Sequence, residues 1–405
     1  MPEFNRLTAK IKQREFKLNA LLEITKAINA NLPVEELLKE YESVLRNDLN
    51  IEKLVLYTRG EQWTCLWKYG VSDVVLEQIS DEAFFQRDSI SFVQGREESF
   101  DMVIPVQQDG RPIAYLLVGD AGEQEVRMSP VVKHMRFIET LTNVLVVAIE
   151  NRKLALERLR QERVKKELEL AAEMQAILLP QELPKTKEFE VGAFYKAHQQ
   201  VGGDYYDFLE LNDEEVMFCM ADVSGKGVSA AFLMANFQAY LRSIFSYKKA
   251  SLKEIVLELN DRVMISAMGE KYITLFLATY NKKTRVLNYI NCGHNPPVLA
   301  DPSGYTQLLK HGCIGLGMFE EIPKIDQGLV HLQENSVVVC YTDGLVEVEN
   351  SVSQEFGIEQ LEQLVLAGKN DSISALNRSL VDAVNDFKGD MPYIDDLAIL
   401  SCRFF

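Results

Sequence analysis

The chain lacks long hydrophobic runs and an excess of basic side chains. No apolar run reaches the roughly 18–20 residues that a membrane-spanning helix needs, and residues 1–18 hold no hydrophobic block typical of a secretory signal. The 43 Lys and Arg are outnumbered by 60 Asp and Glu, which gives a net charge of −17. Because nucleic acids and anionic membranes are bound by clustered basic side chains, this balance argues against both as partners.

The sequence also lacks closely spaced cysteines. Several of its six cysteines stand in apolar, strand-like segments, which is typical of buried thiols in a reducing compartment rather than of disulfides or zinc sites. They are Cys65, Cys219, Cys292, Cys313, Cys340 and Cys402. Together with the missing signal and membrane segments, they predict a cytoplasmic protein.

The 405 residues predict an α+β protein of more than one domain. We expect an N-terminal segment over 1–16, a first α/β domain over 17–148, a helical linker over 149–184 and a second α+β domain over 185–405. In the first domain two helical segments precede alternating strand-like runs and an exit helix. This order resembles a GAF sensory domain. Many GAF domains bind a small ligand and others only dimerise, and the sequence leaves both open.

The linker carries apolar residues seven apart amid mixed charge. One row holds Ile149, Leu156, Leu170 and Ile177, interrupted by Arg163; the neighbouring row holds Val164, Ala171 and Leu178. Two such rows favour a parallel dimeric coiled coil, and hence a homodimer. The alternative is a single long helix that packs on its own domains. Pro180 and Pro184 end the helix.

The second domain alternates strand signals with helical segments. Helices are predicted over 229–245, 252–268, 358–366 and 373–387, and strands over 272–280, 286–291, 336–342 and 397–404. Many antiparallel strands with helices inserted in pairs predict a two-sheet sandwich with helices outside it.

Two carboxylates converge if the polar segment around Asp213 is the turn of a hairpin. That turn places Asp204 opposite Asp222, with Tyr206 opposite Met220, and opposed side chains lie about 4.5–5.5 Å apart on the same face. Such carboxylates repel each other unless a cation lies between them, and neither strand contains Lys or Arg. A hard divalent ion with oxygen ligands would resolve the repulsion.

Two further acids mark strand ends. An apolar run ends at Asp343, and Asp395 and Asp396 precede the last predicted strand. If these strands are antiparallel neighbours, their carboxylates meet at the same end of the sheet. An Asp at a strand end is also a common turn residue. Glycines beside the acids permit the close backbone approach that metal and phosphate sites need.

Five ordered motifs in residues 185–405 resemble the SpoIIE/RsbU-type branch of the metal-dependent PPM serine/threonine phosphatases. They are VGGDYYDF, ADVSGKGVSAAFLMA, NCGHNPP, YTDGLVE and DDLAIL. The resemblance implies an αββα sandwich with two Mn²⁺ or Mg²⁺ ions. It implies that Asp222 bridges the ions, that Asp204 and the Val223 backbone carbonyl serve the first, and that Asp343 and Asp395 hold the second. The ions would activate a water that attacks phosphoserine or phosphothreonine on a small STAS-domain anti-sigma-factor antagonist.

The sequence departs from the eukaryotic branch of this family. Ser224 stands where that branch has a histidine, and its phosphate-binding arginine has no obvious counterpart, so we expect slow turnover. We interpret His294 as a turn residue rather than an acid, and Asp207 as facing away from the ligands. A different class of function is a non-enzymatic interaction protein with a degenerate phosphatase fold, but all four acids are present. A diguanylate cyclase would have Glu and Phe after GGD, where this chain has Tyr205 and Tyr206.

Overall fold

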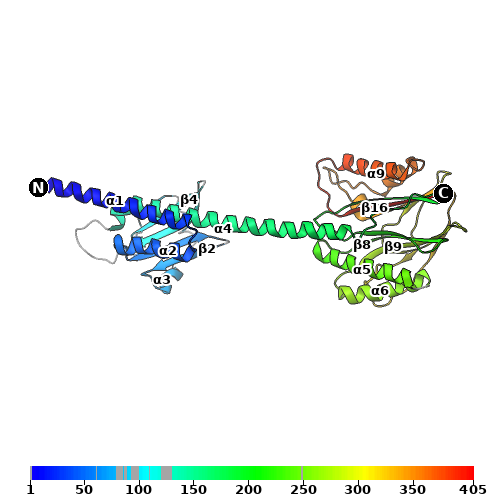
Figure 1. The fold of residues 1–405 in the computed structure, drawn as a ribbon, viewed down its shortest axis with the longest axis horizontal. Helices are drawn as coiled ribbons and strands as arrows, with labels where there is room; N and C mark the ends of the chain where they lie inside the picture. The colour runs from blue at the N-terminus through cyan, green and yellow to red at the C-terminus, as the bar shows by residue number, and fades with distance from the viewer. Residues whose placement is uncertain are drawn as a thin grey trace. The chain divides into compact units, whose positions relative to one another are not determined.

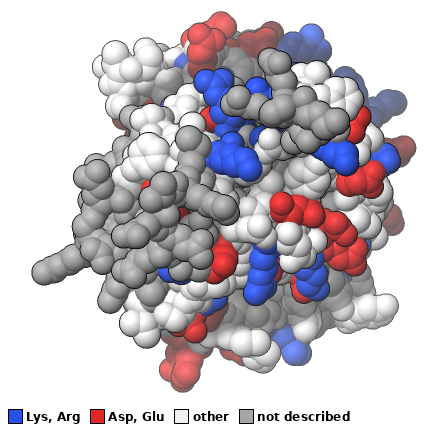
Figure 2. Space-filling view, turned by 90° about the vertical axis from the view of Figure 1, so that its left-hand side faces the viewer, with Lys and Arg blue, Asp and Glu red and all other residues white. Residues whose placement is uncertain are grey.

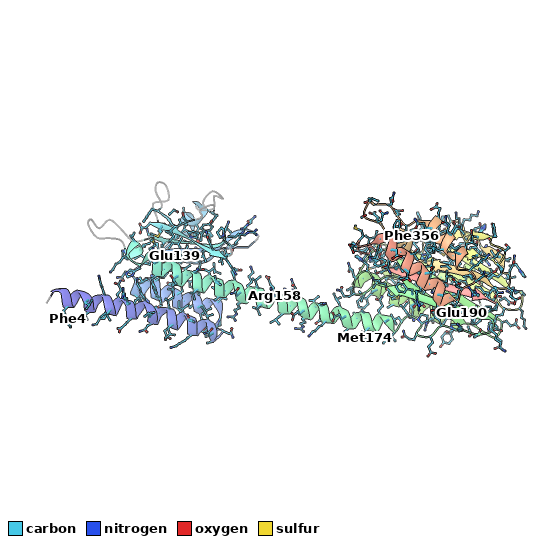
Figure 3. All side chains as sticks on the ribbon, turned by 90° about the horizontal axis from the view of Figure 1, so that it is seen from above. Phe4, Glu139, Arg158, Met174, Glu190 and Phe356 are labelled. Carbon is cyan, nitrogen blue, oxygen red and sulfur yellow. The ribbon has the colours of Figure 1, made fainter. Side chains whose placement is uncertain are left out.

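The computed structural model of the chain describes residues 2–60, 62–78, 85, 89–92, 100–108, 110–119, 130–247 and 250–405 (Figure 1). The chain divides into two compact units, Met1–Glu162 and Arg163–Phe405. The helix α4 (Pro130–Ala176) crosses the boundary between them. Figure 3 follows α4 from Glu139 through Arg158 to Met174 as one uninterrupted helix.

The first unit is built on an antiparallel sheet with the strand order β2–β1–β5–β4–β3. Its strands are β1 (Lys53–Arg59), β2 (Trp63–Tyr69), β3 (Ser91–Phe92), β4 (Met102–Gln108) and β5 (Arg111–Gly119). Helices α1 (Pro2–Asn29), α2 (Val34–Ser43) and the start of α4 share a hydrophobic core with one face of this sheet. A short π-helix (Val44–Asp48) continues α2, and α3 (Asp73–Gln78) follows β2.

Helix α1 begins much earlier than the apolar repeat of the sequence indicated. The repeat starts near Leu18, whereas α1 begins at Pro2. The first turns of α1 carry exposed apolar side chains, among them Phe4 and Leu7. Because these side chains do not face the core, the core-facing repeat did not extend the predicted helix to them. The core contact that fixes the later turns is Ile24, which is 1% exposed.

The second unit contains two sheets. The first has the order β13–β10–β9–β8–β7, with β14 also paired to β10, and the second has the order β12–β11–β15–β16–β6. The strands of the first are β7 (Tyr205–Glu210), β8 (Glu215–Val223), β9 (Ile273–Asn281), β10 (Val286–Cys292), β13 (Gly312–Cys313) and β14 (Gly328–His331). Those of the second are β6 (Phe189–Lys196), β11 (Val298–Ala300), β12 (Thr306–Leu308), β15 (Ser336–Tyr341) and β16 (Leu397–Phe404).

The two sheets pack face to face over one hydrophobic core. The ring of Phe218 on β8 lies 6.1 Å from that of Phe276 in its own sheet and 6.0 Å from that of Phe404 in the other. All three side chains are fully buried. Because inward-facing residues of both sheets meet here, the sheets form the middle of the unit.

Paired helices cover the outer faces of both sheets (Figure 1). Helices α5 (Val228–Tyr247) and α6 (Leu252–Ala267) contact the sheet that contains β8, and α8 (Ile358–Ala367) and α9 (Ile373–Lys388) contact the other. Ser251 and Glu254 form a capping box at the start of α6, which satisfies backbone N–H groups that the helix leaves free. The helix–sheet–sheet–helix order agrees with the predicted sandwich.

No helix among the described residues is both long and apolar enough to cross a membrane. On the face that Figure 2 presents, acidic and basic side chains are interspersed.

Candidate metal centre

The hairpin of β7 and β8 brings Asp204 and Asp222 together. Tyr206 pairs with Met220 and Tyr205 with Ala221, so the predicted register is confirmed. Asp204 lies one residue before this ladder and Asp222 one residue beyond it, so the two carboxyl groups lie at the same end of the hairpin. Asp204 is only 1% exposed, and its Oδ2 has no hydrogen-bond partner among the described residues.

The second sheet brings Asp343 and Asp395 to the same place. Strands β15 and β16 are antiparallel neighbours, with Tyr341 opposite Ile399. Asp343 follows β15 as the first residue of the short helix α7 (Asp343–Val346), and Asp395 precedes β16. Gly344 allows this approach, because a Cβ there would lie 1.9 Å from the backbone oxygen of Asp396. The predicted meeting of these strand ends is therefore observed.

The four carboxyl groups act on one another electrostatically. Burial first, and then Asp222, raises the pKa of Asp204 well above its usual range. Burial, Asp343 and Asp395 raise the pKa of Asp222 to about 7. Burial and Asp395 likewise raise the pKa of Asp343. Such shifts mean that the charged forms lack compensating positive charge, which a bound cation would supply.

The side chain of Asp396 has a different structural role from that of Asp395. Its Oδ1 accepts the His198 N–H at 2.7 Å and its Oδ2 accepts the Gly203 N–H at 2.6 Å. The side chain of Asp396 thus fixes the backbone immediately before Asp204. Its neighbour Asp395 is more accessible, with its side chain 35% exposed.

Gln175 holds the same glycine segment from the end of α4. Its Nε2 donates to the Gly202 carbonyl at 2.6 Å, and its Oε1 accepts the Gly202 N–H at 3.1 Å. Only glycine fits at position 202, since a Cβ would lie 2.4 Å from Asp396 Oδ2. Space is also tight at position 203, because a Cβ there would lie 3.0 Å from the Val223 carbonyl oxygen.

Lys226 is the residue at this site that the sequence reasoning missed. Its Nζ lies 2.7 Å from Asp395 Oδ2 and also donates to the Ile394 carbonyl. Strands β7 and β8 contain no Lys or Arg, whereas Lys226 lies in the loop three residues beyond β8. The signal was present in the sequence, since Lys226 belongs to the segment that follows Asp222 directly.

Asp207 and His294 lie outside the carboxylate cluster. Asp207 is fully buried, accepts two hydrogen bonds from Arg242 and one from the Tyr205 hydroxyl, and so has a structural role. His294 Nδ1 lies 2.8 Å from the hydroxyl oxygen of Thr274, whose residue pairs with Asp222 on β8. Burial lowers the pKa of His294 to about 4, so its ring is neutral near pH 7.

The site is an open set of oxygen donors rather than a closed ligand cage. Among the residues that the structure describes, no three Asp, Glu, His or Cys side chains already stand in the arrangement of metal ligands. One of the four carboxylates, Asp395, is engaged in an ion pair with Lys226. The donor set is nonetheless all oxygen, and the unpartnered buried Asp204 oxygen fits a hard divalent cation.

Comparison with known proteins places the second unit in a family. Residues 212–405 match the family described as Stage II sporulation protein E (SpoIIE). This region is a SpoIIE-family phosphatase domain. The chain is also 27% identical over 255 residues to "Phosphoserine phosphatase RsbU" of Bacillus subtilis (strain 168), a match that covers 60% of this chain and 71% of RsbU.

A second curated relative and one solved structure agree with the SpoIIE assignment. "Phosphoserine phosphatase RsbP" of Bacillus subtilis (strain 168) is 25% identical over 187 residues, which is 45% of this chain and 46% of RsbP. The structure of the SiaA-PP2C domain of Pseudomonas aeruginosa has a TM-score of 0.55 at 20% identity and covers 61% of this chain and 99% of that domain. At that identity the structural match shows the PP2C-type fold.

Proposed function

We propose that this chain is a metal-dependent protein phosphatase that hydrolyses phosphoserine or phosphothreonine. The observation that carries the proposal is the buried carboxylate cluster at the ends of both sheets, with an unpartnered oxygen on Asp204. Two Mn²⁺ or Mg²⁺ ions would be held there. Asp204 and the Val223 carbonyl would serve one ion, Asp343 and Asp395 the other, and Asp222 both.

When bound, the ions supply positive charge that attracts a phosphate monoester and lowers the pKa of a water molecule. The residues around them keep the carboxylates in place. Asp396 and Gln175 fix the backbone before Asp204, and Gly344 lets the loops of Asp343 and Asp395 lie against each other. His294 is neutral and engaged with Thr274, which supports its assignment as a structural residue.

The cysteines of strands β8, β15 and β16 do not support the alternative of a thiolate nucleophile. Cys219, Cys340 and Cys402 are completely buried, and burial raises the pKa of each thiol. A nucleophilic cysteine needs a lowered pKa and access to its substrate. Water remains the nucleophile that this site can support.

Removal of divalent metal tests the proposal. We expect a chelator to abolish phosphate release from a phosphoserine protein by the full-length chain, and added Mn²⁺ or Mg²⁺ to restore it. Free phosphate is the quantity to measure. A rate that survives chelation would exclude the metal-dependent reaction, and no release at any metal concentration would favour the non-enzymatic alternative.

The resemblance to the SpoIIE/RsbU branch extends this proposal to a partner. We infer that the substrate is a phosphorylated STAS-domain protein in the cytoplasm. The first unit would act as a GAF-like sensor, for which its five-stranded sheet with helices on one face gives support. A small ligand on this unit would be the signal.

The exposed apolar stripe of α4 supports the further proposal of a dimer through the linker. Leu156, Val164 and Leu170 are 59%, 50% and 59% exposed, although each belongs to one of the two seven-residue rows. These side chains are exposed to solvent in a single copy of α4, and a second copy of the helix would bury them. Paired linkers would then transmit the state of the sensor to the phosphatase domain.

Charge placed on this stripe tests the dimer. We expect the double change Val164→Glu and Leu170→Glu to weaken self-association of the full-length chain at least roughly tenfold, because a buried unpaired carboxylate is costly. Lys165→Glu introduces the same side chain on the opposite face of α4 and is the control. Light scattering gives the mass. Equal masses for the double variant and the control would contradict the proposed linker interface.

A further inference from the structure

Lys226 lies beside the carboxylate cluster, where positive charge would stabilise the ionised acids. It lies in the loop between the end of β8 at Val223 and the start of α5 at Val228, directly after Asp222. Its ammonium contacts Asp395 Oδ2 at 2.7 Å and the Ile394 carbonyl. Asp395 is one of the two carboxylates proposed to hold the second ion. Lys226 therefore contacts the same carboxylate that this ion would need.

The ammonium also acts on the neighbouring acids. Burial and Asp395 raise the pKa of Asp343, and Lys226 partly offsets both. It acts in the same direction on Glu347, whose pKa is raised by burial and Asp343. One lysine thus partly neutralises several carboxyl groups at the end of the second sheet.

The contact of Lys226 with Asp395 is easily broken. The two side chains are 42% and 35% exposed, and exposed ion pairs are weak. Lysine has a flexible four-carbon stem, and Lys226 stands between Gly225 and Gly227, both with positive φ. The pair of Arg242 and Asp207 is different, because that carboxylate is fully buried and held by two hydrogen bonds.

We propose that Lys226 is a displaceable counter-cation of Asp395, which occupies that carboxylate in the metal-free protein and must leave it when a divalent ion binds. The inference rests on the proposed function, since it assigns Asp395 to a metal. A cation that must be displaced opposes binding of the ion. Lys226 thereby sets the metal affinity of the phosphatase domain, and metal occupancy moves its ammonium away from Asp395.

The test is a calorimetric titration of Mn²⁺ into the metal-stripped full-length chain, without any phosphatase assay. We expect Lys226→Met to bind Mn²⁺ roughly three- to tenfold more tightly than the wild type at its weaker site, because a competing charge is gone. Lys226→Arg keeps the charge and should stay near the wild-type affinity. A Lys226→Met affinity that is unchanged or weaker would overturn the inference.

Two controls show whether the change in Mn²⁺ affinity comes from freeing Asp395 or from the general loss of a positive charge. Lys271 has its Nζ 2.9 Å from the Ser224 carbonyl, so Lys271→Met removes the same charge from this loop region without freeing Asp395. An equal gain in Mn²⁺ affinity in Lys271→Met would overturn the proposal that Lys226 and the ion compete directly for Asp395. In an Asp395→Asn background, Lys226→Met should give no gain, and a gain there would likewise overturn the proposal.

The same titration distinguishes failure of this inference from failure of the proposed function. If the wild-type chain binds no Mn²⁺, both are wrong. If it binds Mn²⁺ and Lys226→Met binds it no more tightly, only the role of Lys226 is wrong. Thermal unfolding of each metal-free variant confirms that the compared proteins are folded.

Discussion

Replacing Asp222 by asparagine is expected to lower the phosphoserine phosphatase rate of the full-length chain by roughly 10³-fold. Asp222 is the acid proposed to contact both ions, and it acts electrostatically on Asp204, Asp343 and Asp395. Loss of the shared ligand would remove several kcal/mol of transition-state stabilisation, and about 1.4 kcal/mol corresponds to tenfold in rate. Initial rates of phosphate release at saturating Mn²⁺ measure the effect.

A matched control is available in the same hairpin. Asp213 lies in the exposed turn between β7 and β8, and Asp213→Asn removes the same charge far along the strands from the carboxylate cluster. We expect this variant to keep the wild-type rate. Similar losses in both variants would contradict a specific role for Asp222.

Stability provides a second readout for Asp222→Asn. In the metal-free protein the pKa of Asp222 is raised from 3.8 to about 7, so the native state binds more protons than the unfolded state between these values. Stability therefore falls as the pH rises from about 4 to 7, and the penalty is complete above pH 7. Asparagine carries no such penalty, so at pH 8 the metal-free variant should melt no lower than the wild type. A lower melting temperature would attribute the lost activity to misfolding.

Much of the phosphatase domain follows from regular patterns in the sequence. The predicted strand over 397–404 agrees with β16, whose eight residues are all buried. The predicted hairpin register also agrees with the structure, because the apolar strands and the polar turn between them leave little freedom in strand pairing. The meeting of Asp204 with Asp222 follows from that register. The meeting of Asp343 with Asp395 follows from the antiparallel pairing of β15 and β16.

Contacts made by loop backbone could not be predicted in the same way. The hydrogen bonds of Asp396 and Gln175 to Gly203 and Gly202 depend on where the segment before β16 and the end of α4 pass the loop before β7. Periodicity carries no information on that. The contact between Lys226 and Asp395 joins residues 169 positions apart at the ends of two different sheets. Short strands such as β13 were missed because two residues are too few to show an alternating pattern.

Replacing Arg242 by methionine is expected to destabilise the phosphatase domain by about 3 kcal/mol. Arg242 on α5 donates to both oxygens of Asp207 at 2.7 and 3.0 Å, and Asp207 is fully buried on β7. Without the guanidinium the carboxylate stays buried, and among the described residues its remaining partners are the Tyr205 hydroxyl and the Phe208 N–H. Breaking a buried pair typically costs about 3–5 kcal/mol, and the low end applies because the Arg242 side chain is 40% exposed.

The location of the tryptophans makes this loss measurable within one unit. Both tryptophans, Trp63 and Trp67, belong to the first unit, so their fluorescence in a urea titration follows Met1–Glu162, whereas hydrogen exchange of the β7 and β8 amides follows the phosphatase domain. We expect Arg242→Met to increase exchange in those strands and to leave the tryptophan transition in place. Arg163→Met removes an exposed partner of Glu167 and should change stability by less than about 0.5 kcal/mol.

The double variant Asp207→Asn with Arg242→Met should recover part of the stability that Arg242→Met loses, because no charge is then buried without a partner. Destabilisation equal to that of Arg163→Met would show that Asp207 does not depend on Arg242.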